Sequence, residues 1–286
     1  MSITEFPVDD PGSGPYGVTT GPDGAVWFTM AGSGAVGRMS TTGEQRTFPL
    51  GDDSAQPTSI TTGPDGALWF TLGRAHAIGR ITTGGVLTRF PLGEVMPYGI
   101  TRGPDEALWF SEMTVGALAR IDTDGVVTEF PLGVPNAMPG YVTTGPDGAL
   151  WCTLNQADAI ARVTPTGQVT VHALPTRGAA PVGIAGAPDA LWFVEIGAGA
   201  VGRITTDGAI AEFPLPDPTA RPHAVITADD GGCWFTEWAS NRLGHVDPHG
   251  RFTHHDLPGT EPHGLASGPD DAIWVAQESG ALARFD

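Results

Sequence analysis

Seven tryptophans recur along this chain at nearly constant intervals. Neighbouring members lie 40 to 42 residues apart, at Trp27, Trp69, Trp109, Trp151, Trp192, Trp234 and Trp274. A period near 40 residues that fills a whole chain is typical of a repeat architecture. Because a repeat preserves its scaffold, side chains that occur in only one or two copies are the candidates for function.

The third copy shows how each repeat is built. It divides into four short segments, Pro97 to Thr101, Ala107 to Ser111, Ala117 to Asp122 and Val126 to Phe130, with turns such as Gly103-Pro104-Asp105 between them. Runs of five or six residues bounded by glycine, proline and aspartate are typical of strands and hairpins. Four antiparallel strands in about 40–45 residues predict one blade of a β-propeller.

The chain ends indicate how the ring closes. The last copy stops at Phe285-Asp286 after its third strand, and the missing fourth strand occurs at the N-terminus as Thr4-Glu5-Phe6-Pro7. We therefore predict an all-β, seven-bladed propeller in which residues 1–286 form one domain and the N-terminal strand completes the last blade. Closure of this kind removes the free sheet edges of an open array.

Charge excludes several classes of partner. The chain has 32 acidic residues and 14 basic residues, all of them arginine, for a net charge of −18. This balance argues against nucleic acid and against a membrane surface as partners. Six arginines share one position in the third strand, which indicates structural pairing with turn carboxylates; they are Arg38, Arg80, Arg120, Arg162, Arg203 and Arg284.

Cysteine usage and the N-terminus bear on the compartment. Cys152 and Cys233 fall in second strands in different registers, so we expect two buried thiols and no disulfide, which suits a reducing compartment. The N-terminal segment lacks the apolar region of a signal peptide, and no apolar run is long enough to span a membrane. We expect a cytoplasmic monomer.

Strand directions place the variable residues of the repeat. The turns of the GPDG and TDG type fall on one face of the ring; first strands start and second strands end on the opposite face, which we call the mouth face. There His223 begins the sixth copy, Glu261 and His263 begin the seventh, and Glu278 follows the second strand of the seventh. Two carboxylates beside histidines suit a hard divalent cation with a neighbouring base.

A competing interpretation is that these are ordinary polar residues lining a solvated channel. Glu112, Glu195 and Glu237 strengthen it, because they share the position three residues after tryptophan without obvious chemistry. The remaining histidine cluster, His249, His254 and His255, surrounds an outer turn and fourth strand, and we expect these side chains to be solvated.

The repeated GPDGALWFT, the third strands like IGRIT and the fourth strands like EFPL resemble the virginiamycin B lyase family over the whole chain. The most specific matches are ARPHAV from Ala220, WFTEW from Trp234, EPHG from Glu261 and the Trp274 to Glu278 segment. The resemblance implies that Glu261 and Glu278 bind Mg²⁺, that His263 is the general base and that His223 contacts the substrate. Val275, Gln277 and Ser279 depart from the family pattern beside Glu278.

The resemblance also implies a reaction. The substrate would be a small cyclic depsipeptide antibiotic of the streptogramin B type, closed by an ester to a threonine side chain. Mg²⁺ would polarise a carbonyl while His263 removes the threonine α-proton, so the ring opens by elimination and resistance follows. Tyr16 and Tyr98 are candidates to stack on the substrate. Two other classes stay open: a metal-dependent hydrolase such as a lactonase, and a non-catalytic ligand-binding propeller.

Overall fold

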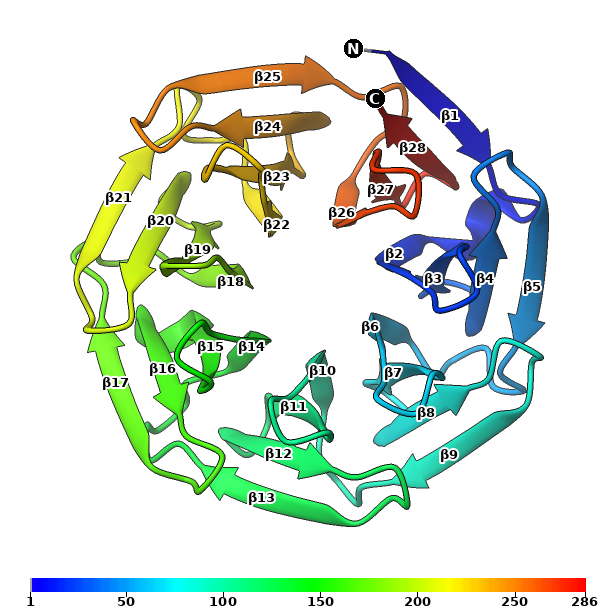
Figure 1. The fold of residues 1–286 in the computed structure, drawn as a ribbon, viewed down its shortest axis with the longest axis horizontal. Coiled ribbons are helices and arrows are strands. Elements are labelled where there is room, and N and C mark those ends of the chain that lie inside the picture. The colour runs from blue at the N-terminus through cyan, green and yellow to red at the C-terminus, as the bar shows by residue number, and fades with distance from the viewer. Residues whose placement is uncertain (1) are drawn as a thin grey trace.

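Seven four-stranded antiparallel sheets surround a central axis (Figure 1). This computed structural model describes residues 2–286, which contain 28 strands and two short 3-10 helices. The predicted all-β, seven-bladed propeller is confirmed. In the third copy, each predicted strand end lies within one residue of the observed end.

The first three blades each use four consecutive strands. Blade 1 contains β2 (Pro15–Thr20), β3 (Val26–Met30), β4 (Ala35–Met39) and β5 (Gln45–Pro49). Blade 2 contains β6 (Pro57–Thr62), β7 (Leu68–Leu72), β8 (Ala77–Ile81) and β9 (Leu87–Pro91). Blade 3 contains β10 (Pro97–Arg102), β11 (Leu108–Glu112), β12 (Ala117–Ile121) and β13 (Val127–Pro131).

The next three blades follow the same order. Blade 4 contains β14 (Pro139–Thr144), β15 (Leu150–Leu154), β16 (Ala159–Val163) and β17 (Val169–Ala173). Blade 5 contains β18 (Pro181–Gly186), β19 (Ala190–Glu195), β20 (Ala200–Thr205) and β21 (Ile210–Pro214). Blade 6 contains β22 (Pro222–Thr227), β23 (Cys233–Glu237), β24 (Arg242–Val246) and β25 (Phe252–Asp256). The helices η1 (Pro11–Ser13) and η2 (Asn155–Ala157) lie in connections.

Blade 7 combines both ends of the chain. It contains β26 (Pro262–Ser267), β27 (Ile273–Gln277), β28 (Ala281–Phe285) and, as its outermost strand, β1 (Ile3–Pro7). The two end strands pair antiparallel from Ile3↔Phe285 to Pro7↔Ala281, and both termini lie beside this blade in Figure 1. The Phe6 ring stacks on Trp274 with 5.2 Å between ring centroids. The predicted closure by the N-terminal strand is confirmed.

A turn aspartate joins the second and third strands of most blades. Asp105 accepts hydrogen bonds from Trp109 Nε1 at 2.9 Å and from Arg120 Nε at 2.5 Å. Burial alone would raise the pKa of Asp105, but these two hydrogen bonds lower it. The same arrangement recurs at Asp23, Asp65, Asp147 and Asp270. All six third-strand arginines pair with turn carboxylates as predicted.

Hydroxyl groups in the second strands tie neighbouring blades together. Thr29 Oγ1 accepts the Gly17 N–H of its own blade and donates to the Thr58 carbonyl of blade 2. Thr236 Oγ1 likewise accepts the Ala224 N–H and donates to the His263 carbonyl of blade 7 at 2.8 Å. This bond holds the first strands of blades 2, 3, 4, 5 and 7 to the preceding blade, whereas Val194 and Ala276 replace the hydroxyl residue before blades 6 and 1.

Two further sequence expectations concern the interior and the membrane. Cys152 and Cys233 are buried free thiols, as predicted. Within residues 2–286, no helix has the length and apolar character needed to cross a membrane.

We predict that Asp105→Ala lowers the free energy of unfolding by about 1–3 kcal/mol, because the indole N–H of the fully buried Trp109 would lose its partner. Asp189→Ala is the matched control. Asp189 has an exposed side chain that pairs only with Arg203, so its loss should cost about 0–1 kcal/mol. Urea unfolding of both variants measures the difference, and equal losses would contradict the assigned role of the indole bond.

Candidate active site

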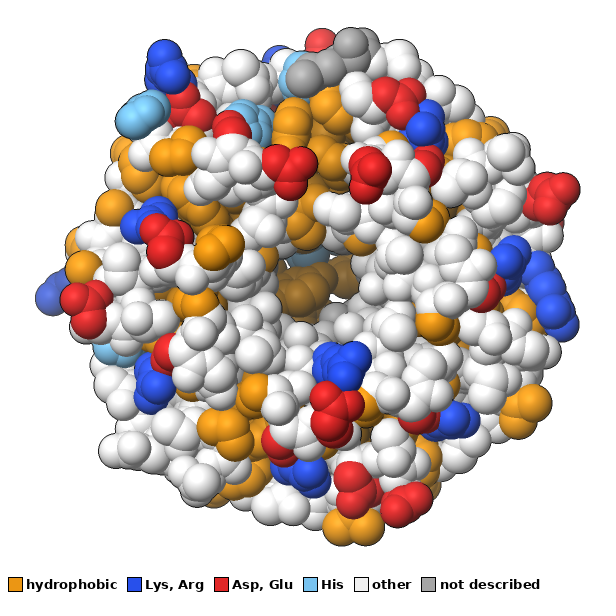
Figure 2. Space-filling view, in the orientation of Figure 1, with side chains coloured by type: hydrophobic (Ala, Val, Ile, Leu, Met, Phe, Trp, Pro, Cys, Tyr) orange, Lys and Arg blue, Asp and Glu red, His pale blue; other side chains and the backbone are white. Residues whose placement is uncertain are grey.

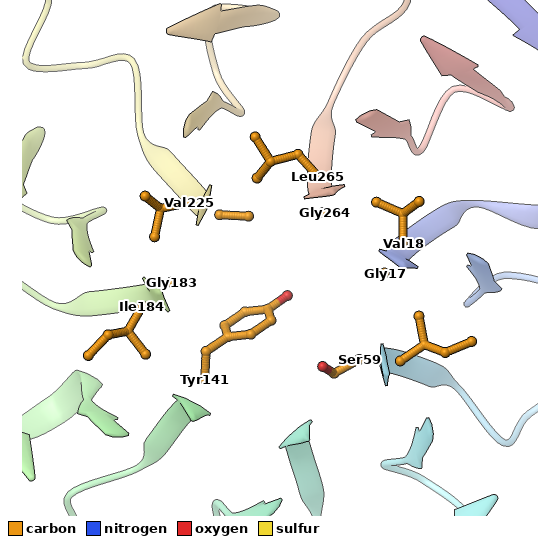
Figure 3. Close-up of a pocket in the computed structure, with 11 residues that line it drawn as sticks. Gly17, Val18, Ser59, Tyr141, Gly183, Ile184, Val225, Gly264 and Leu265 are labelled. Atoms are coloured by element: carbon orange, nitrogen blue, oxygen red, sulfur yellow. The ribbon is translucent and has the colours of Figure 1, made fainter. Parts of the chain in front are cut away.

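The innermost strands leave a narrow channel on the axis of the ring. A cavity of about 140 Å³ is lined mainly by first-strand residues, among them Gly17, Ser59, Gly183 and Gly264, and the Tyr141 side chain points into it (Figure 3). Glycine is required at Gly17, because a Cβ there would lie 2.3 Å from the Thr58 carbonyl oxygen. In Figure 2 this central hollow has a floor of orange and pale-blue side chains, the colours of apolar or tyrosine residues and of histidine.

An aromatic cluster crosses the axis near the mouth face. It combines first-strand residues of five blades: Tyr16, Tyr98, Tyr141, His223 and His263. The Tyr16 ring stacks on His263 with 4.1 Å between centroids, and its hydroxyl lies 2.8 Å from the Tyr98 hydroxyl. The chain has only three tyrosines, and all of them are in this cluster.

His263 is enclosed on three sides. Its side chain is 9% exposed, the Tyr16 ring covers one face and the His223 ring meets it edge-on at 4.7 Å. Nε2 lies 2.7 Å from Glu278 Oε2, whereas Nδ1 is buried without a hydrogen-bond partner among the described residues. Burial lowers the pKa of His263 to about 4, so the imidazole is neutral at pH 7.

His223 is held in the same way. It is 6% exposed, and its Nε2 lies 3.4 Å from the Tyr16 hydroxyl. Burial, and then the neighbouring His263, lower the pKa of His223 to about 3. The competing interpretation placed these histidines in a solvated channel. Both side chains are instead buried and packed among tyrosines.

Glu261 and Glu278 lie together at the exposed rim of the mouth face. The Glu278 N–H donates to the Glu261 carbonyl at 3.1 Å, and the Glu278 stem packs over Gly14 of blade 1. Glu261 has a left-handed φ of 55°, a conformation that non-glycine residues rarely adopt. The residues at the same position of five other blades share it, among them Arg221 and Gly14, so the conformation belongs to the repeat scaffold.

The residues that depart from the family pattern support the loop before Glu261. Gln277 Oε1 accepts the Gly259 N–H at 2.8 Å, and Ser279 Oγ accepts the Thr260 N–H at 3.0 Å. The Glu261 N–H itself donates to Asn241 Oδ1 of blade 6 at 3.0 Å. Gln277 and Ser279 therefore help to position Glu261 by hydrogen bonds to the backbone.

The donor set of this rim fits a hard cation. Two exposed carboxylates on adjacent segments supply oxygen ligands, and Mg²⁺ commonly binds one or two carboxylates and keeps several waters. Between residues 2 and 286, no group of three or more His, Cys, Asp or Glu side chains is arranged to hold a metal ion alone. A cation here would need water or substrate oxygens to complete its coordination.

Comparison with known proteins decides the family. The sequence profile of the virginiamycin B lyase family matches residues 1–285. The chain belongs to the virginiamycin B lyase family. A virginiamycin B lyase of Nocardia farcinica is 48% identical over 112 residues, which are 39% of this chain and 40% of that protein, so this alignment spans less than half of the relative.

Solved structures extend the likeness over nearly the whole chain. A streptogramin B lyase structure superposes with a TM-score of 0.95 at 36% identity, covering 99% of this chain and 96% of the other. A catalytically inactive histidine-to-alanine variant of the Staphylococcus aureus virginiamycin B lyase, solved with quinupristin, gives a TM-score of 0.94 at 36% identity, covering 99% and 98%. Membership of the virginiamycin B lyase family indicates a lyase.

The carboxylates after the blade tryptophans do not join this rim. Glu112, Glu195 and Glu237 are at most 1% exposed, and the titratable neighbour with the largest effect on each belongs to the fourth strand of its blade: Glu129, Glu212 and His254. Glu237 Oε1 lies 3.2 Å from His254 Nδ1, so the expectation that His254 is simply solvated is wrong. Burial raises the pKa of Glu195 to about 8, and the nearby Glu212 adds to the shift.

Tyr141 was missed by the sequence analysis, although it lines the channel beside Tyr98 and His223. In blade 4 Gly140 occupies the position that Tyr16 and Tyr98 fill in their blades, and the tyrosine comes one residue later. The rarity of tyrosine in this chain was the available signal.

We predict that Glu195 makes the protein less stable as the pH rises from about 4.5 to about 8. The unfolded carboxyl ionises near its ordinary pKa of 4.5, whereas the folded one stays protonated up to about 8, so the unfolded state is favoured in that interval. Glu195→Gln should flatten this part of the profile of unfolding free energy against pH. The exposed Glu44→Gln serves as control, and identical profiles for wild type and Glu195→Gln would contradict the prediction.

Proposed function

We propose that this protein is a Mg²⁺-dependent lyase that opens cyclic depsipeptides of the streptogramin B type by elimination at the threonine ester. The observation that carries the proposal is the contact between the enclosed imidazole of His263 and the rim carboxylate of Glu278 at 2.7 Å, with Glu261 hydrogen-bonded to the same segment. A candidate base and one rim carboxylate are thus in contact, and the segment of the second glutamate is bonded to theirs through the backbone. Opening such an antibiotic in the cytoplasm would confer resistance.

His263 is the residue that we assign to proton removal. Protein encloses Nδ1, so a substrate proton must reach Nε2, which faces the rim. In this structure the Glu278 carboxylate occupies that position, and its side chain is 44% exposed, which leaves room for it to turn away. The stack on Tyr16 and the hydrogen bond from Thr236 to the His263 carbonyl keep the ring and its strand in place.

Glu261 and Glu278 would hold the cation. Bound Mg²⁺ would polarise the carbonyl next to the α-carbon and stabilise the negative charge that develops when the proton leaves. A carboxylate has two oxygens, so Glu278 offers a second oxygen besides the one that contacts His263. The hydrogen bond from the Glu278 N–H to the Glu261 carbonyl fixes the spacing of the two segments at the rim.

His223 is assigned to substrate binding. Its ring packs edge-on against His263 and its Nε2 contacts Tyr16, so a substrate that reaches His263 also meets this part of the cluster. The catalytically inactive histidine-to-alanine relative supports the proposal, because loss of one histidine inactivates an enzyme of the same fold and quinupristin is present in its structure.

We predict that wild-type protein with Mg²⁺ converts a quinupristin-type depsipeptide into a linear product of unchanged mass with α,β-unsaturated amide absorbance. His263→Ala should lower kcat by about 10²–10⁴-fold, the usual effect of losing a general base. His223→Ala should act more on KM. Mass spectrometry with steady-state kinetics is the measurement. A product heavier by one water would indicate a hydrolase such as a lactonase, and an unchanged ring would leave a ligand-binding propeller.

We predict that exhaustive dialysis against EDTA abolishes turnover and that Mg²⁺ or Mn²⁺ restores it. Glu261→Gln and Glu278→Gln should each weaken the metal dependence, raising the Mg²⁺ concentration for half-maximal activity, while the unfolding midpoint changes little because both side chains are exposed. Glu106→Gln, an exposed carboxylate change on the opposite face, is the control. Full activity of the EDTA-treated protein would remove the cation from the reaction.

A further inference from the structure

Each blade has two equivalent positions at the mouth face: the residue before the proline of the first strand and the residue after the second strand. In every blade the N–H of the latter residue donates to the carbonyl of the former at 2.9 to 3.3 Å. The seven pairs are Gly14 and Ala31, Gln56 and Gly73, Met96 and Met113, Met138 and Asn155, Ala180 and Ile196, Arg221 and Trp238, and Glu261 and Glu278. Met96 and Met113 thus occupy in blade 3 the positions of the two rim glutamates in blade 7.

These methionines line a groove between blades 3 and 4. The groove has a volume of about 640 Å³ and is formed by Met96, Met113 and Met138 together with neutral residues such as Pro135 and Gln156. No charged side chain lines it, in a chain with a net charge of −18. Met138 is 38% exposed, so this apolar side chain of the groove is open to a ligand from solvent.

The groove is directly across the ring from Glu261 and Glu278. In a ring of seven blades, the point opposite blade 7 lies between blades 3 and 4, as the positions of β26, β10 and β14 in Figure 1 show. The strands that begin beside the groove also carry two members of the aromatic cluster, because Tyr98 follows Met96 by two residues and Tyr141 follows Met138 by three. Within the cluster, the Tyr98 hydroxyl lies beside that of Tyr16, which stacks on His263, the proposed base.

A second groove of similar size on blade 1 provides the contrast. Its volume is about 580 Å³, and Asp9, Asp10 and Asp53 line it together with Met30. Three carboxylates make that surface unsuitable for an uncharged apolar group, which would strip them of water without compensation. The two grooves are therefore similar in size and differ in the charge of the side chains that line them.

We propose that the groove of Met96, Met113 and Met138 is a specificity subsite that binds an apolar side chain of the depsipeptide while its ester lies at Glu261, Glu278 and His263. The inference rests on the proposed function for the identity of the ligand. Methionine suits this task, because its flexible thioether adapts to irregular apolar groups and makes favourable contacts with aromatic rings. A macrocycle that spans the mouth would be oriented by contacts at both sides of the ring.

Methyl NMR tests the subsite without turnover. Protein labelled with ¹³C at the methionine methyl groups and carrying His263→Ala is titrated with quinupristin, and resonances are assigned by single Met→Leu changes. Shifts should appear at Met96, Met113 and Met138 and be absent at Met39, which is buried in blade 1, and at Met30, which lines the acidic groove. Unmoved groove methyls, or shifts centred on Met30, would overturn the proposal.

Kinetics in the otherwise wild-type protein provides an independent test. Met113→Asp should raise KM for quinupristin about tenfold, equivalent to about 1.4 kcal/mol, with kcat within about twofold of wild type. Val126→Asp is the matched control, since Val126 is 61% exposed on the opposite face of the same blade. An unchanged KM for Met113→Asp would refute the subsite and leave the lyase proposal intact. A wild-type protein that opens no ring would refute the lyase proposal, and the methyl shifts alone would then decide the subsite.

Discussion

The hydrogen bond from the blade tryptophan to the turn aspartate is the contact on which five of the seven blades depend. The indole is buried between blades, and its N–H must find an acceptor, because a buried donor without a partner costs free energy. In five blades one aspartate accepts hydrogen bonds from that indole N–H and from the guanidinium of the third strand. A single carboxylate in the turn after the first strand is thus bonded to the second and third strands. Blade 5 lacks one turn residue, and there the Trp192 N–H has no partner among the described residues.

With the scaffold held in this way, function is free to vary at the mouth face. Every blade offers the same two positions with the same backbone hydrogen bond between them, and the side chains at these positions differ. Glutamates at these positions in blade 7 give a site for a hard cation, whereas methionines in blade 3 give an apolar surface. In blade 6 the same positions hold Arg221 and Trp238, with the guanidinium 5.8 Å from the indole centroid. The mouth face thus combines regions of different chemistry on one repeated backbone hydrogen bond.

The interior also contains buried carboxyl groups that are not part of the candidate site at the mouth face. Burial raises the pKa of Glu112 to about 7 and that of Glu195 to about 8, and each has a second glutamate nearby on the fourth strand. The turn aspartates behave in the opposite way, because their hydrogen bonds lower the pKa. The stability that the turn aspartates contribute is therefore lost as the pH falls through their lowered pKa values, whereas the buried glutamates reduce stability as the pH rises from about 4.5 to about 7 and about 8.

The sequence by itself determined the ring, because blade contacts are local and repeat with the period of 40 to 42 residues. Strand positions, closure by the N-terminal strand and the pairing of Arg120 with its turn carboxylate all follow from that register. The sequence also marked Glu261, His263 and Glu278 as neighbours, since they belong to one blade. Their roles as ligands and base stay predictions.

Only the tertiary structure decided what surrounds these residues. His263 and His223 are packed with Tyr16, Tyr98 and Tyr141, through long-range contacts such as that between Tyr16 and His223, which are 207 residues apart. No repeat register predicts such contacts, because they form where the first strands of different blades meet at the axis. The burial of Glu195 and the methionine groove likewise arise from surfaces that separate blades contribute. Ring closure brings these surfaces together, and a linear pattern carries no information about which side chains then touch.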